Sequence, residues 1–197
     1  MSGPKVIHKR MVNGVMNEED KTPPSPEEFT PIFHMCDEKD FDMKTKESSG
    51  LYFSATFDAD KFIHATEDPQ FLLEAGNHFY KDVPGEWCCL KIDAAKLNCE
   101  IVYENPAPVG TIEAVDYKAD HELKEEPLFP HIYGGISADS VMERYKISKY
   151  SFPFHFSLSK CMFLCDQFYT NSFIFIYNYA NKSNNKQLEA MMVLLIV

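Results

Sequence analysis

The chain of 197 residues has a hydrophobic fraction of 45% and a charged fraction of 25%, values typical of a globular domain in water. The formal net charge is −11, and no stripe of Lys and Arg follows the chain, which excludes general nucleic-acid binding. The first residues lack the apolar run of a secretory signal, no apolar run is long enough for a bilayer, and the six cysteines show neither zinc-type nor dense disulfide spacing. We therefore expect a cytoplasmic protein with reduced thiols and no membrane partner.

Composition divides the chain into three predicted regions. Residues 1–30 end in KTPPSPEEFT, where prolines beside acids indicate a disordered N-terminal lead-in. Residues 31–150 form the predicted compact domain. Residues 151–197 are an aromatic tail with few charges, which is either an extra layer on the core or sequence foreign to the domain.

Within residues 31–150, hydrophobic patterning predicts an α+β fold with a curved mixed β-sheet and few helices. Short strands are expected at residues 32–36, 62–66, 87–92, 100–104, 128–133 and 141–147. A short helix is expected after Asp37, and the main helix begins at Asp68-Pro69, where an acidic cap precedes a proline in the first turn. Residues 105–127 are a long connection with many acids and prolines, which predicts a lid or an insertion.

Three of the seven histidines lie inside short apolar strands, in the phrases IFHMC, FIHAT and FPHIYG. Since alternate residues of a strand share a face, His64 points with Thr66, and His131 points with Tyr133. His34 lies in the same kind of pattern on its own strand. We predict that the three imidazoles line one pocket and are the catalytic candidates, with Thr66 and Tyr133 as ligand-binding residues.

Two alternatives for these histidines stay open. A single histidine in an apolar strand is commonly a hydrogen-bonded core residue. Three imidazoles can also bind a catalytic zinc ion, but the phrases lack the close His-x-His or His-x-x-x-His spacing of common metal motifs, so no metal site is predicted. Glu104, at the end of a predicted strand, is a further ligand-binding candidate that either orients a histidine, binds a ribose hydroxyl or forms a salt bridge.

The segments IFHMC, DKFIHAT, NHFYK, WCCLKIDAAKL, EIVYE and LFPHIYG, taken in this order, resemble the family called domain of unknown function 952 (DUF952). The likeness covers residues 31–147, and FIHAT followed by FPHIYG is a fairly specific pair. The resemblance implies an ADP-ribosyltransferase-like fold, whereas the activity and substrate of the family are not established. Both tails lie outside the likeness.

In ADP-ribosyltransferase-like folds, the nicotinamide–ribose cleft is lined by the first strand, the second strand and a later strand. The resemblance therefore implies that His34, His64 with Thr66, and His131 with Tyr133 line such a cleft. We assign no cofactor, and NAD is a candidate substrate.

Two positions depart from the pattern that the resemblance implies. His131 stands where many transferases carry a glutamate, whose charge would stabilise positive charge developing on the ribose. This histidine-rich arrangement is more similar to the RNA 2′-phosphotransferase branch. Lys61 stands where the family usually has a glycine before the FIH motif.

Three functions remain in competition. The first is an ADP-ribosyltransferase-like transferase that binds NAD, an ADP-ribosyl compound or another phosphorylated nucleotide. The second is a non-catalytic nucleotide-binding or interaction module that uses the same cleft. The third is a zinc-dependent hydrolase with the three histidines as ligands.

Overall fold

The computed structural model describes residues 3–12, 15–47, 49–80, 82–117, 121–151 and 154–158, which belong to one compact unit, Met1–Ser159. The described residues form an α+β fold with three β-sheets and three α-helices, which confirms the predicted fold class. None of the helices in these ranges is long and apolar enough to cross a membrane.

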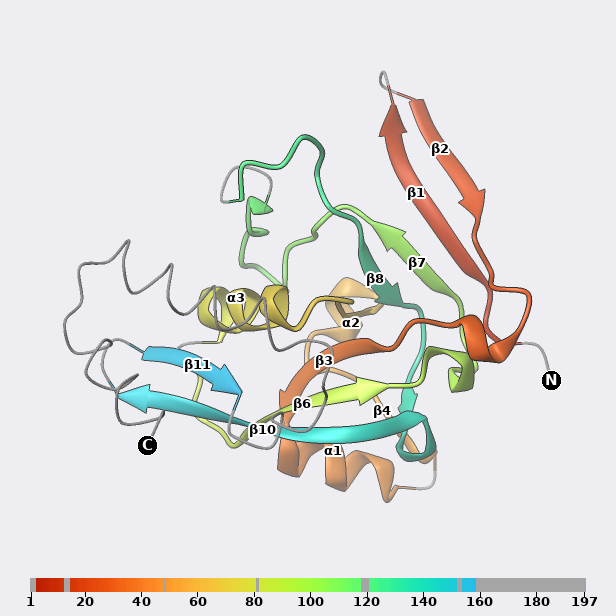
Figure 1. Ribbon diagram of the computed structural model, residues 1–197. Helices are drawn as coiled ribbons and strands as arrows, with labels where there is room; N and C mark the ends of the chain where they lie inside the picture. Colours follow the sequence, from red (N-terminus) through yellow and green to blue (C-terminus); the bar gives the residue numbers. More distant parts are fainter. Residues whose placement is uncertain are drawn as a thin grey trace, which may run out of the picture. The chain divides into compact units, whose positions relative to one another are not determined.

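The largest sheet has five strands in the order β2-β1-β7-β8-β5. Its strands are β1 (Val6–Val12), β2 (Val15–Asp20), β5 (Ile63–His64), β7 (Ile101–Glu104) and β8 (Phe129–Ile132). Strand β1 runs parallel to β7, whereas the other neighbours are antiparallel, so the sheet is mixed. Figure 1 shows β1 and β2 as a hairpin at one edge of this sheet.

A second, antiparallel sheet has four strands in the order β11-β10-β6-β3. Its strands are β3 (Ile32–Asp37), β6 (Trp87–Ile92), β10 (Val141–Ser151) and β11 (Phe154–Leu158), and a two-stranded sheet pairs β4 (Leu51–Tyr52) with β9 (Ile136–Ser137). Strand β6 lies inside its sheet and is buried at five of its six positions. Its unbroken apolar sequence therefore gives an interior strand, as predicted.

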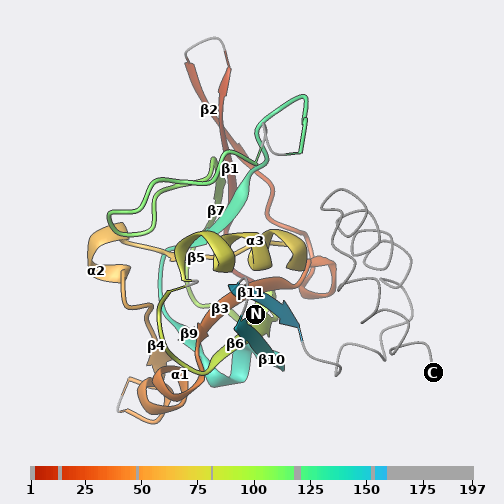
Figure 2. The same ribbon diagram turned by 90° about the vertical axis from the view of Figure 1, so that its left-hand side faces the viewer.

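The helices are α1 (Glu38–Thr45), α2 (Phe57–Asp60) and α3 (Pro69–Phe79), with the single-turn 3-10 helices η1 (Pro26–Glu28), η2 (Ala94–Lys96) and η3 (Ala138–Ser140). Helix α3 begins where the sequence predicts, because the Asp68 carboxylate accepts a hydrogen bond of 2.8 Å from the Gln70 N–H and Pro69 fills the first turn. Figure 1 and Figure 2 both show α3 lying over β3, which it contacts.

One hydrophobic core serves the larger sheets and the short elements beside them. Its fully buried members include Ile32 and Leu90 from the four-stranded sheet and Ile63, Ile101 and Ile132 from the five-stranded sheet. The edges of the two sheets also meet directly. Phe33 of β3 and Thr66, just after β5, exchange two backbone hydrogen bonds of 2.7 and 3.0 Å.

The predicted disorder of residues 1–30 does not hold for β1 and β2, which belong to the five-stranded sheet. Val6 and Ile7 are buried, and β1 finds its parallel partner β7 far along the chain. The compact domain therefore begins before residue 31. The proline and acid content that indicated disorder is concentrated after this hairpin, in residues 21–31.

The predicted end of the domain near residue 150 also differs from the structure. Strand β10 continues to Ser151, and β11 pairs with it in antiparallel register, so the sheet gains a strand beyond the expected boundary. Residues 159–197, which include most of the aromatic tail, lie outside the described residues. Whether these residues form an extra layer on the core or are foreign to the domain is therefore not tested by the structure.

Candidate functional site

Strand pairing brings His64 and His131 face to face. The two residues are directly opposite each other in the antiparallel pair of β5 and β8, so their side chains share one face of the sheet. Their ring centroids are 5.2 Å apart in an edge-to-face arrangement. The alternation of side chains within the two strands therefore predicted this part of the site correctly.

His34 reaches the same place from the other sheet. The backbone pairing of Phe33 with Thr66 sets β3 beside β5, and His34 Nδ1 donates a hydrogen bond of 2.7 Å to the backbone oxygen of His64. His34, His64, His131 and Thr66 all line one cavity. The prediction that three histidines converge in one pocket is thus confirmed, while the catalytic roles stay a prediction.

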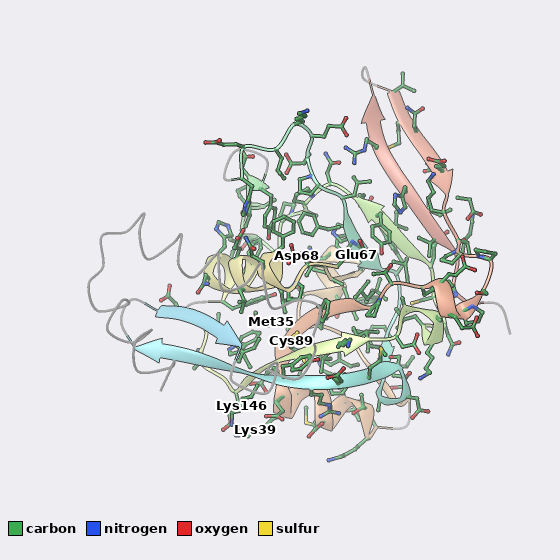
Figure 3. The ribbon with its side chains drawn as sticks, in the orientation of Figure 1. Met35, Lys39, Glu67, Asp68, Cys89 and Lys146 are labelled. Atoms are coloured by element: carbon green, nitrogen blue, oxygen red, sulfur yellow. The ribbon has the colours of Figure 1, made fainter. Side chains whose placement is uncertain are left out.

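The cavity has a volume of about 70 Å³. Met35 of β3, labelled in Figure 3, and Leu72 and Gly76 of α3 form part of its lining, so it lies between β3 and α3. The segment 106–117 contributes a wall through Pro106, Ala107, Val109, Val115 and Tyr117. This volume holds several water molecules or one small polar group, and it is well below the roughly 300–1,000 Å³ of drug-sized pockets.

His131 is held by a carboxylate and an aromatic ring. Its Nδ1 donates a hydrogen bond of 3.0 Å to Glu104 Oε1, and the Tyr133 hydroxyl donates to the same oxygen at 2.7 Å. The Phe62 ring stacks on the imidazole with centroids 4.0 Å apart and planes 12° from parallel. Glu104 therefore orients a histidine, which is one of the roles expected for it.

Each of the three imidazoles has one nitrogen bound to a protein acceptor. His34 uses Nδ1 toward a backbone oxygen, His131 uses Nδ1 toward Glu104, and His64 uses Nε2 toward Asp60 Oδ2 at 3.2 Å. Oxygen acceptors require a proton on these nitrogens, so in the neutral ring the second nitrogen is a bare acceptor. The site thus presents an array of hydrogen-bond acceptors.

Burial keeps two of these rings uncharged. Desolvation lowers the pKa of His34 to about 4, and burial together with the neighbouring His131 lowers the pKa of His64 to about 4. The hydrogen bond from His131 lowers the pKa of Glu104 below its usual value, so this carboxylate is ionised at neutral pH. Among the described residues, His34 Nε2 and Ser54 Oγ are buried polar atoms without a hydrogen-bond partner, and both residues line the cavity.

The remaining predicted residues have different places. Thr66 lines the cavity, but its hydroxyl is engaged with Asp68, whose N–H donates to Oγ1 at 3.1 Å and whose backbone oxygen accepts from it at 3.2 Å. Glu104 and Tyr133 connect to the cavity through His131 and are absent from its described lining. Sequence reasoning missed Ser54, which follows no periodic pattern, and Asp60, whose spacing of four residues from His64 was the available signal.

The described part of the chain contains no group of side chains that could bind a metal ion. No three or more His, Cys, Asp or Glu side chains there are arranged to hold a metal ion. The rings of His64 and His131 meet edge to face, and the ring of His34 contacts the backbone oxygen of His64.

The chain belongs to the family described as Protein of unknown function (DUF952), which matches residues 36–144 and so includes most of the cavity. Its fold is similar to that of protein CC0527 from Caulobacter crescentus, with a TM-score of 0.45 and 18% sequence identity over 62% of this chain and 90% of that one. A double mutant of CC0527 gives the same TM-score and coverage at 17% identity. No curated protein matches the chain.

Proposed function

We propose that the histidine-lined cavity binds the ribose of NAD or of an ADP-ribosyl nucleotide. The observation that carries the proposal is the shared polarity of the three rings, each with one nitrogen committed to the protein and the other left as an acceptor. Ribose hydroxyls are hydrogen-bond donors and match such an array. An ADP-ribosyltransferase-like fold, implied by the resemblance of the sequence motifs, is part of the same proposal.

The charge of the site favours the ribose over the phosphates of such a nucleotide. His34 and His64 are uncharged at neutral pH, because burial lowers both pKa values to about 4. A bare imidazole nitrogen has no proton to donate to a phosphate oxygen, whereas it accepts well from a hydroxyl. The volume of about 70 Å³ admits only a small polar part of the ligand, so the rest of the nucleotide would lie outside the cavity.

Transfer chemistry would use His131 as the base. In that reaction the bond between the ribose carbon and nicotinamide breaks, an acceptor oxygen bonds to the same carbon, and the acceptor's proton moves to His131 Nε2. Glu104 holds the opposite nitrogen at 3.0 Å and would stabilise the imidazolium so formed. The nicotinamide leaves as the neutral base.

Binding without turnover is the second candidate, and one observation favours it. Glu104 lies behind His131 and is absent from the described lining of the cavity, so no carboxylate there faces the developing charge on the ribose. The protein would then be a nucleotide-binding module rather than an enzyme.

Calorimetric titration of the full chain with NAD, ADP-ribose and zinc separates these functions. We expect NAD and ADP-ribose to bind, and His131→Gln to weaken binding at least tenfold. His8→Gln is the matched control, because His8 stacks on Tyr103 and lines a different cavity. Release of nicotinamide from bound NAD identifies a transferase, and its absence identifies a binding module. The proposal is contradicted if neither NAD nor ADP-ribose binds, or if zinc binds tightly in a stoichiometric amount.

A further inference from the structure

Asp60 has the least exposed carboxylate among the ion pairs of the described residues, with 7% of its side chain accessible. It ends α2, and Lys61 follows in a left-handed conformation with φ of 70°, which turns the chain toward β5. This turn sets the carboxylate beside the ring of His64, four residues later. A carboxylate buried to this degree needs hydrogen-bond donors to offset its lost hydration.

Two donors from distant parts of the chain meet at this carboxylate. His64 Nε2 donates to Oδ2 at 3.2 Å, and the backbone N–H of Gly110 donates to Oδ1 at 3.1 Å and approaches Oδ2 at 3.4 Å. Gly110 has a φ of 58° and lies in a tight turn that two backbone hydrogen bonds between Val109 and Ile112 close. The left-handed backbone at Gly110 aims its N–H at Asp60.

The turn at Gly110 belongs to the segment 106–117, which forms one wall of the histidine-lined cavity. The other donor, His64, lines the cavity itself. One carboxylate therefore contacts both a ring that faces the cavity and the segment that encloses it. Hydrogen bonds to a charged acceptor are about twice as strong as those between neutral groups, so both contacts constrain their donors firmly.

We propose that Asp60 is a positioning residue, whose carboxylate holds the His64 ring with its proton on Nε2 and fixes the wall segment 106–117 to that ring. The bare Nδ1 of His64 and the shape of the cavity are then set by the same group. The identity of the ligand rests on the proposed function, but the positioning role does not. A surface ion pair would leave the tautomer of His64 and the wall segment unaffected.

The test compares full-length Asp60→Asn with Asp58→Asn, an exposed acid of the same helix that removes the same charge. An amide has an NH₂ group in place of one oxygen, so Asp60→Asn loses either the acceptor of His64 at Oδ2 or the shorter contact of Gly110 at Oδ1. We expect either a change of the His64 tautomer in long-range ¹H–¹⁵N spectra, or exchange of the Gly110 amide hydrogen at least tenfold faster. Asp58→Asn should match the wild type in both measurements.

An Asp60→Asn variant that leaves both signals unchanged would overturn the proposal. If this variant does not fold, the wild-type spectrum decides, because a His64 ring protonated on Nδ1 contradicts the proposed geometry by itself. Titration with NAD and ADP-ribose adds a separate result: Asp60→Asn should weaken binding at least tenfold, and equal affinity would refute control of the cavity. If the wild type binds neither nucleotide, the proposed function fails, and the two ligand-free signals still decide the role of Asp60.

Discussion

The hydrogen bond of 2.7 Å from His34 Nδ1 to the backbone oxygen of His64 joins the two larger sheets at the cavity. It fixes the proton of His34 on Nδ1 and leaves Nε2 buried without a partner among the described residues. A buried polar atom without a partner costs about 1–3 kcal/mol. A water molecule or a ligand group in the cavity that donates to this nitrogen would remove that cost.

Burial of His34 makes the stability of the protein depend on pH. Its folded-state pKa of about 4 lies below the ordinary histidine value of 6.5, so between these values the unfolded chain binds more protons than the folded one. Stability therefore rises with pH across this window and is lost as the pH falls from about 6.5 to 4, by on the order of 3 kcal/mol. Urea unfolding of wild type and His34→Gln at several pH values measures this. The difference between the two should vary with pH, and a constant difference contradicts the prediction.

Glu104→Gln should destabilise the fold, because it removes the charged acceptor shared by His131 and Tyr133. Hydrogen bonds to an ionised group contribute more than neutral ones, so we expect a loss of about 1–2 kcal/mol in the free energy of unfolding. Glu100→Gln is the control, since its ion pair with Lys5 is exposed and should contribute less than about 0.5 kcal/mol. Equal losses in the two variants, measured by chemical unfolding, would show that the Glu104 contacts do not stabilise the fold.

Two similar substitutions in the N-terminal hairpin should change the stability by different amounts. Val6 is 6% exposed in β1, where Val6→Ala removes buried methyl groups and should cost about 1–3 kcal/mol. Val15 is 61% exposed in β2, so Val15→Ala should change the stability by less than about 0.5 kcal/mol. Thermal unfolding compares them. If the Val6→Ala and Val15→Ala proteins are equally stable, the result supports the disorder that composition indicated for residues 1–20.

Two truncations locate the end of the domain. A chain that stops after Ser159 keeps β11 paired with β10 and should retain the melting temperature of the full chain. A chain that stops after Tyr150 loses β11 and should melt several degrees lower, because the end of β10 then loses its hydrogen bonds to β11. Calorimetry of the two chains is the measurement. Equal melting temperatures would support the original boundary near residue 150.

The parts of the site that sequence reasoning found depend on local periodicity. The faces of His64 and His131 follow from side-chain alternation, and the start of α3 follows from Asp68-Pro69. The contact of His34 with the His64 backbone depends on where two sheets meet, which no local pattern encodes. The position of Asp60 beside His64 depends on the left-handed turn at Lys61, and such a backbone conformation is unusual for a residue other than glycine.

The N-terminal strands illustrate a different limit of sequence reasoning. Composition averages over a window, and the prolines of residues 21–31 dominated the window that also contains β1. The partner that stabilises β1 is the parallel strand β7, far along the chain. Pairing at such a separation is a property of the whole topology, so a reading of residues 1–30 alone does not reveal it.

Strand β2 closes one edge of the five-stranded sheet, and all six of its residues are exposed. Among the described strands β2 pairs with β1 alone, and three of its side chains are acidic: Glu18, Glu19 and Asp20. A second copy of the same edge would bring like charges together, which disfavours sheet extension between molecules. The acidic side chains of β2 therefore disfavour association of two molecules through this edge of the sheet.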